Sequence, residues 1–288
     1  MRSLSFLILL FAGWAPAQVT EPFFFIQATD PQFGYSARKL DDFRQETANF
    51  EFLIATANRL RPAFVVVTGD LTNRASNPGQ VAEYLRIAAK LDKSIPIYNA
   101  PGNHDIGDTV APDHLANYRK TFGPDYYTFR HGGAAFFVLN SCVISNPQRV
   151  PGELEKQERW LREELEKARQ DGVRPLMVFQ HHPWFLSSAD EADQYTNILQ
   201  DRRKRFLALF REYGVSHVFA GHLHRNVPAK DGGIEMTTTA AIGQARGKDR
   251  AGFRVVIVRP DSVEHQYHDM GSVPNQIELE KTAARDAK

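Results

Sequence analysis

Polar side chains that could bind metal ions follow five predicted β-strands, each at the point where an apolar run ends. They are Asp30 and Gln32, Asp70, Asn103 and His104, His181, and His222 and His224. In an α/β protein, neighbouring strand ends converge on one side of a sheet, and sites are built there. Oxygen and nitrogen donors without thiolate suit two adjacent divalent cations such as Mn²⁺, Fe²⁺ or Zn²⁺, and a bridging carboxylate holds such ions ~3.5–4 Å apart. The pattern therefore predicts a dinuclear metal site.

The densest of these clusters is the run Gly102-Asn103-His104-Asp105. Gly102 permits a tight turn, Asn103 offers a neutral amide oxygen to a cation, and His104 can exchange a proton near neutral pH. Taken alone, the run is equally typical of a solvent-exposed turn with an incidental histidine. The other four clusters favour the functional interpretation.

The elements that must position these side chains alternate between strand and helix in the first half of the chain. Apolar runs predict strands at residues 23–28, 64–67, 95–99, 126–130, 134–140, 176–180, 215–220, 234–239, 253–258 and 262–267. Helical spacing of apolar residues predicts helices at 42–60, 78–91, 112–122, 154–168 and 201–213. This order indicates an α/β fold with two mixed sheets packed together and helices outside.

The motif order D-x-Q, GD, GNHD, H and GHxH resembles that of the calcineurin-like metallophosphoesterase superfamily, from Asp30 to His224. Within it the chain is most similar to the calcineurin-like phosphoesterase domain-containing protein 1 group, also called complete serine/threonine protein phosphatase. The stretches that carry this resemblance are residues 22–27, 30–34, 102–107, 178–181 and 221–226. The resemblance implies a four-layer α/β/β/α sandwich, which we expect over residues 18–270.

The resemblance also implies a role for each polar residue. Asp70 bridges the two metals; Asp30, Gln32 and His224 complete one metal site, and Asn103, His181 and His222 complete the other. His104 does not ligate but donates a proton to the leaving-group oxygen, and Asp105 is a candidate to orient it. His182 competes with His181 for one ligand position, and the motif favours His181.

The activity implied is hydrolysis of phosphomonoesters, phosphoserine and phosphothreonine among them, by in-line attack of metal-bound hydroxide. The substrate is a phosphorylated small molecule or protein. A phosphodiesterase with the same metals is the first alternative. A non-catalytic, metal-stabilised binding protein is the second, because Gln32 stands where most of the superfamily has histidine. Asn73 replaces the tyrosine of the purple acid phosphatases, which argues against that branch.

Three aromatic residues in the segment after His181 leave two interpretations open. Trp184, Phe185 and Tyr195 could form an apolar wall beside the substrate, or they could cover the sheet. Arg74 is either a phosphate contact or a surface residue. Cys142, the only cysteine, follows an apolar run and is expected to be a buried, inert thiol.

The two ends of the chain differ in composition from the domain between them. Arg2, the apolar run from Leu4 to Trp14 and the small residues around Ala17 predict a signal peptide at residues 1–17, so we expect an exported, secreted or periplasmic protein. Residues 271–288 are expected to form a poorly ordered, charged tail. The formal charge is +1, and removing Arg2 takes it to 0, so nothing favours nucleic-acid binding. A stable membrane span in the mature chain is not expected either. The oligomeric state stays open.

Overall fold

Two mixed β-sheets form the centre of the computed structural model, which describes residues 18–36 and 42–280. The first sheet has the order β11-β10-β1-β2-β3, from β1 (Phe23–Ala28), β2 (Val65–Thr68), β3 (Ile97–Ala100), β10 (Gly252–Val258) and β11 (Val263–Asp269). The second has the order β4-β5-β6-β7-β9-β8, from β4 (Tyr127–His131), β5 (Ala134–Val138), β6 (Leu176–Phe179), β7 (Val215–Ala220), β8 (Val227–Asp231) and β9 (Ile234–Thr238).

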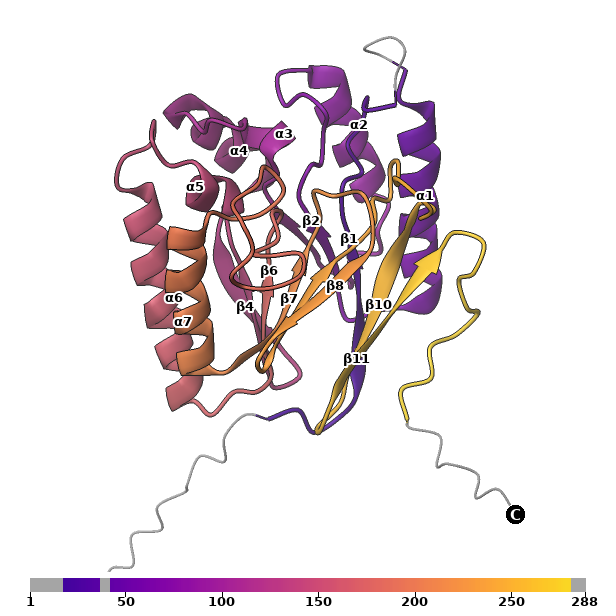
Figure 1. Cartoon of the computed structure of the whole chain (residues 1–288). Helices are drawn as coiled ribbons and strands as arrows, with labels where there is room; N and C mark the ends of the chain where they lie inside the picture. Colours follow the sequence, from indigo (N-terminus) through magenta and orange to yellow (C-terminus); the bar gives the residue numbers. More distant parts are fainter. Residues whose placement is uncertain (1–17, 37–41, 281–288) are drawn as a thin grey trace, which may run out of the picture.

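Helices cover the outer faces of both sheets, as Figure 1 shows. The pair α1 (Arg44–Leu60) and α2 (Pro78–Ala88) lies on the first sheet, and the pair α6 (Glu153–Gln170) and α7 (Gln200–Tyr213) lies on the second. Three further helices lie at one end of the molecule: α3 (Asn103–Ile106), α4 (Pro112–Phe122) and α5 (Ser141–Ser145). The arrangement confirms the predicted sandwich of two mixed sheets with flanking helices.

The alternation of side chains along β1 explains why the sheets stack. Successive residues of a strand point to opposite faces. Phe24 and Ile26 face the helices, whereas Phe25 faces the other sheet, where its ring centroid lies 5.7 Å from that of Phe136 and 5.6 Å from that of Phe179. Because both faces of the strand are buried, the run is apolar throughout.

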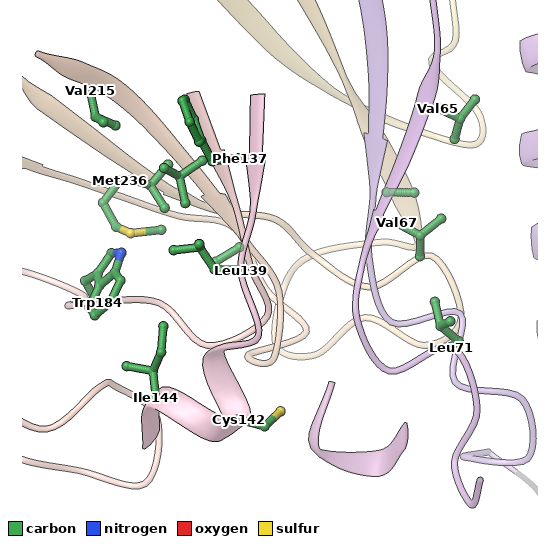
Figure 2. Packing of buried hydrophobic residues seen from close by; sticks show 14 of the residues in the cluster. Val65, Val67, Leu71, Phe137, Leu139, Cys142, Ile144, Trp184, Val215 and Met236 are labelled. Atoms are coloured by element: carbon green, nitrogen blue, oxygen red, sulfur yellow. The ribbon is translucent and has the colours of Figure 1, made fainter. Parts of the chain in front are cut away.

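The helix-facing core of the second sheet also fixes the start of the segment after His181. Figure 2 shows Trp184 with Met236, Leu139 and Ile144 in this cluster. The Trp184 ring stacks on Phe206 of α7, with centroids 5.1 Å apart. Cys142 is buried and free of any disulfide, as predicted.

Three elements were missed from the sequence. Strand β8 and the short helices α3 and α5 were not predicted. Residues 271–280, expected to be poorly ordered, contact the domain: Arg259 Nε donates to the Leu279 carbonyl (2.7 Å), and Ile277 and Leu279 pack against the core. Residues 281–288 and the predicted signal peptide lie outside the described residues. Within the described ranges, no helix is long and apolar enough to cross a membrane.

Candidate metal centre

The seven predicted ligands meet where the carboxyl ends of strands from both sheets converge. Asp30 and Gln32 follow β1, Asp70 follows β2 and Asn103 follows β3, three adjacent parallel strands of one sheet. His181 follows β6, and His222 and His224 follow β7, two adjacent parallel strands of the other sheet. Six of the seven are almost fully buried, and His222 is partly buried. The site therefore spans the seam between the two sheets.

One half of the site is built from Asp30, Asp70 and His224. One ligand atom from each of these three lies within 4.8 Å of the others. Oδ1 of Asp30 lies 3.3 Å from Nε2 of His224. The sequence analysis assigned these three residues, together with Gln32, to one of the two metal sites.

The other half is built around His181. Its Nε2 lies 3.0 Å from Oδ1 of Asn103 and 3.3 Å from Oδ2 of Asp70. The ring centroid of His222 lies 5.1 Å from that of His181. The same Asp70 Oδ2 is 3.4 Å from Nε2 of Gln32. Asp70 thus stands between the two halves, where a bridging carboxylate has to be.

Buried polar atoms without partners mark where cations fit. Oε1 of Gln32 and Nε2 of His222 are buried without a hydrogen-bond partner, and Oδ1 of Asp30 has no hydrogen bond beyond its 3.3 Å contact with Nε2 of His224. Leaving such an atom unsatisfied costs ~1–3 kcal/mol, so native proteins rarely do it without a reason. Carboxylate, amide and imidazole donors are the ligands that divalent metal ions take. The donor set therefore fits a pair of divalent cations, and Gln32 offers its amide oxygen for one of them.

The backbone at the ligands is held in an unusual conformation. Five ligands have positive φ angles: Asp30 (51°), Gln32 (41°), Asp70 (49°), His222 (72°) and His224 (55°). Among the described residues that are not glycine, Arg61 at the end of α1 is the one further case. Such conformations cost ~1–3 kcal/mol each and cluster at functional sites, where surrounding structure enforces them. The strained backbone at these residues lowers the stability of the fold, and it fixes the direction of their side chains.

Two glycines have no room for a side chain because atoms of the predicted ligands or of their neighbours occupy the space of a Cβ. A Cβ on Gly102 would collide with the carboxylate of Asp70. A Cβ on Gly221 would collide with Thr29 and with Oδ2 of Asp30. Neither glycine has a positive φ, so close approach, not conformational freedom, is what requires glycine at these positions.

Backbone carbonyls fix the orientation of three histidine rings. Nδ1 lies 2.9 Å from the Thr68 carbonyl in His181, 2.7 Å from the Gln244 carbonyl in His224, and 2.9 Å from the Asn73 carbonyl in His104. Because a carbonyl only accepts, each Nδ1 carries the proton and Nε2 is presented to the site. This arrangement is typical of histidines that bind metal ions.

Asp105 does not orient His104 as the sequence suggested it could. Its carboxylate accepts hydrogen bonds from the backbone amides of Leu71 (3.1 Å), Thr72 (3.0 Å) and Gly102 (2.9 Å). Burial, together with the charge of Asp70, raises the pKa of Asp105 to about 7. Asp105 therefore ties the turn after β2 to the start of α3, and the Asn73 carbonyl holds the His104 ring.

Asp108 is a functional residue that the sequence did not reveal. Its Oδ1 accepts a hydrogen bond from Nδ2 of Asn103 at 3.0 Å. This bond turns the amide so that Oδ1 of Asn103 faces His181. The hydroxyl of Tyr195 donates to the same oxygen of Asp108 at 3.3 Å. Asp108 thus positions a predicted ligand from outside the metal site.

The electrostatics of the site favour cations. Burial alone would lower the pKa of His181, but the charge of Asp70 and its hydrogen bond raise it to about 9. Burial and the charge of His181 lower the pKa of His222 to about 4. Burial alone would lower the pKa of His224, but the charge of Asp30, its hydrogen bond and the Gln244 carbonyl together raise it. Since a cation and a proton compete for these rings, metal affinity is expected to fall as pH falls.

The aromatic residues after His181 divide between the two interpretations left open. Trp184 and Phe185 are fully buried and cover the sheet. Tyr195 is 68% exposed, and its ring centroid lies 5.1 Å from that of His222. His182 is buried beside His222, and its Nδ1 is bonded to Ser141 Oγ, whereas Nε2 of His181 faces Asn103 and Asp70. Tyr195 alone among the three aromatic residues stands at the site.

Comparison with known proteins agrees with this geometry. Residues 25–226 match the calcineurin-like phosphoesterase family, and this range includes all seven predicted ligands. The chain belongs to the calcineurin-like phosphoesterase family. It is a metal-dependent phosphoric ester hydrolase, and the family implies divalent metal ions at the site described above.

Relatives of this calcineurin-like phosphoesterase extend over most of its length. Proteins named serine/threonine-protein phosphatase CPPED1 are 35% identical over 263 residues in Bos taurus and 36% identical over 266 residues in Homo sapiens. Each alignment covers 86% of this chain and 84% of the relative. A solved structure, described as a dimetal phosphatase from Danio rerio, superposes with a TM-score of 0.64 at 18% identity, covering 88% of this chain and 97% of that one. The shared fold is that of the two-sheet sandwich.

Proposed function

We propose that this chain hydrolyses phosphomonoesters, with phosphoserine and phosphothreonine as candidate substrates, using two divalent ions drawn from Mn²⁺, Fe²⁺ and Zn²⁺. The observation that carries the proposal is the buried carboxylate of Asp70, whose Oδ2 lies between Gln32 on one side and His181 on the other. The relatives named as serine/threonine phosphatases support the choice of monoesters.

The proposed chemistry divides between the ions and the chain. When bound, the ion pair supplies positive charge that offsets the charge of the phosphoryl group and makes water more acidic. Asp30, Gln32 and His224 would hold one ion, Asn103, His181 and His222 the other, and Asp70 both. The His104 ring is fixed through Nδ1, so Nε2 is the atom that would pass a proton to the leaving oxygen.

The fixed geometry of Asp70 supports its bridging role. Its Oδ1 accepts a hydrogen bond from the His104 backbone amide at 2.9 Å, which leaves Oδ2 directed at the other ligands. The same bond places His104 next to the bridging residue. The proton donor and the metal ligands are thus linked through one backbone contact.

A comparison of two chromogenic substrates tests the proposal. Purified protein loaded with Mn²⁺, Fe²⁺ or Zn²⁺ is assayed on p-nitrophenyl phosphate and on bis-p-nitrophenyl phosphate. We expect the monoester to be hydrolysed with the higher kcat/KM. A preference for the diester would instead favour the phosphodiesterase. Metal-dependent gain in melting temperature with no turnover of either ester would favour the non-catalytic binding protein.

The substrate class within the monoesters needs a separate assay. Release of inorganic phosphate from phosphoserine- and phosphothreonine-containing peptides is compared with release from small phosphorylated alcohols. Faster release from the peptides supports a protein phosphatase, and faster release from the alcohols supports a small-molecule phosphatase.

We also propose that the chain is exported, on the support of the n-region charge, apolar run and small residues of positions 1–17. N-terminal sequencing of the protein recovered outside the cytoplasm is expected to begin at Gln18. A mature protein that still begins at Met1 would contradict export by cleavage.

A further inference from the structure

A cavity of about 350 Å³ opens beside His104, in the space between α2, α3 and α4. Figure 1 places these three helices at the same end of the molecule as the strand ends that carry the ligands. The volume falls within the ~300–1,000 Å³ of small-molecule pockets. Asn103, a predicted metal ligand, and His104 are among its lining residues. A molecule in this cavity therefore touches the predicted proton donor.

One face of α4 forms the far wall of this cavity. The residues that line it from α4 are spaced three or four apart, as one helical face requires: His114, Asn117, Tyr118, Thr121 and Phe122. Asn117 and Thr121 are exposed at the mouth, whereas Tyr118 is 2% exposed. The Tyr118 hydroxyl is buried and has no hydrogen-bond partner.

The charged and titratable groups around the cavity are mostly engaged by the protein itself. The His114 ring is bonded to the Ile106 carbonyl at 2.8 Å, and the Asp105 carboxylate is held by three backbone amides. Arg74 also lines the cavity but is exposed to solvent. What remains for a bound molecule is a mixed surface: the exposed side chain of Arg74, the neutral groups of Asn117 and Thr121, and the apolar surface of Val81 and Phe122. This lining suits a body that has both an apolar face and a polar edge.

A second cavity, of about 370 Å³, lies on the other side of Asn103 and has a different chemistry. It is lined by Tyr195, Asp193 and Cys142, and His104 is not among its lining residues. A leaving alcohol must lie next to the group that protonates it, within about 3.2 Å or through one water. His104 lines the first cavity and not the second, so the first is where a leaving alcohol would lie next to it.

Resting on the proposed function, we infer that the cavity between α2, α3 and α4 binds the leaving alcohol of the substrate. An aryl phosphate monoester, whose ring would pack on Val81 and Phe122, is the probe for this cavity. Hydrolysis breaks the bond between phosphorus and the leaving oxygen, and water supplies the new oxygen on phosphorus. The His104 ring, carrying a proton on both nitrogens, gives the Nε2 proton to the departing alcohol and keeps the Nδ1 proton on the Asn73 carbonyl. The proton that the attacking water loses restores the ring for the next turnover.

Filling the mouth of this cavity tests the assignment. Thr121→Trp and Asn117→Trp place a large ring on the exposed face of α4, and Gln148→Trp makes the same change at the exposed rim of the second cavity. The assay is kcat/KM for 1-naphthyl phosphate, with the inhibition constant of inorganic phosphate as the second measurement. Inorganic phosphate has no leaving group, so it reports the phosphoryl site alone.

We expect each α4 variant to lose about tenfold or more in kcat/KM, mainly through KM, because the apolar contact with the naphthyl body is lost. Phosphate inhibition in these variants, and both measurements in Gln148→Trp, should stay within about twofold of the wild type. Equal losses in Gln148→Trp, no loss in either α4 variant, or parallel loss of phosphate inhibition in both would overturn the assignment. A wild-type protein that hydrolyses no ester would instead refute the proposed function.

Discussion

The same strands carry two regions of opposite character, an aromatic core between the sheets and the ligand cluster at their carboxyl ends. Phe25 and Asp30 belong to β1 and the turn after it, and Phe179 and His181 to β6 and the residues that follow. The aromatic core is fully buried and packs ring on ring, with Phe136 and Phe179 centroids 5.8 Å apart. The ligand cluster is equally buried, yet it contains unpaired polar atoms and positive φ angles.

The difference shows that the aromatic core stabilises the fold, whereas the ligand cluster depends on the rest of the fold for its geometry. Buried aromatic contacts stabilise the native state, whereas unsatisfied polar atoms and strained backbone cost free energy. The core therefore has to hold the ligand cluster in place. Changes in the core should alter stability without altering chemistry, and changes in the cluster should do the reverse.

The largest effect is expected for Asp70→Asn. It removes the charge of the residue that lies between both halves of the site, so turnover should fall to background and at most one ion should be retained. The measurements are phosphatase activity and metal content by elemental analysis. Asp113→Asn, the same change at an exposed position of α4, should match the wild type. Retention of two ions and full activity by Asp70→Asn would show that Asp70 does not bind both ions.

Replacing His104 by alanine should separate chemistry from metal binding. A positioned proton donor contributes roughly 10²–10⁴-fold to rate, so kcat should fall by that factor while metal content is unchanged. His131→Ala, in the β4–β5 hairpin, is the control and should leave kcat as it is. Loss of metal together with activity in His104→Ala would show that this histidine is a ligand.

Phe136→Ala tests the opposite region. Phe136 is fully buried between the sheets, and truncating such a side chain costs ~3–5 kcal/mol of unfolding free energy. Chemical denaturation measures this loss, and activity per folded molecule should stay within about twofold. Phe52→Ala, on the exposed side of α1 at 36% exposure, should cost far less. A stable Phe136→Ala protein with damaged catalysis would contradict the division of roles.

Asp108→Ala should produce the smallest of these effects. Residues that orient a ligand from outside the metal site typically contribute 10–100-fold to metal affinity. We expect a loss in that range, measured by competition with a metal-binding dye. Asp108→Asn keeps an oxygen that can accept from Asn103 and should lose less. Equal affinity in all three proteins would remove Asp108 from the site.

Much of this site was predictable because the signal is local. Each ligand follows an apolar strand, and parallel strands bring their ends together, so Asp70 and Asn103 could be placed from the pattern alone. Strand β8 was missed because its sequence, Val227–Asp231, contains Pro228 and two charged residues. Proline is tolerated there because β8 is an edge strand.

The parts that sequence reasoning missed depend on contacts between distant or irregular segments. The bond from Asn103 to Asp108 exists only once α3 has formed its single turn. The anchoring of residues 271–280 depends on Arg59 and Arg259, and Arg59 donates to the Pro274 carbonyl at 3.1 Å across 215 residues of sequence. The spacing and hydropathy of the residues in the sequence do not predict such contacts. Asp105 was misread because neighbours in sequence need not be neighbours in space.

Titration of the purified wild-type chain with Mn²⁺ in a calorimeter, with phosphatase activity followed in the same sample, tests the central claim most directly. We expect two ions to bind per chain and activity to rise as they bind. We also expect that activity to be lost when a chelator removes the ions. Binding of fewer than one ion per chain, or ester hydrolysis that survives complete removal of metal, would contradict it.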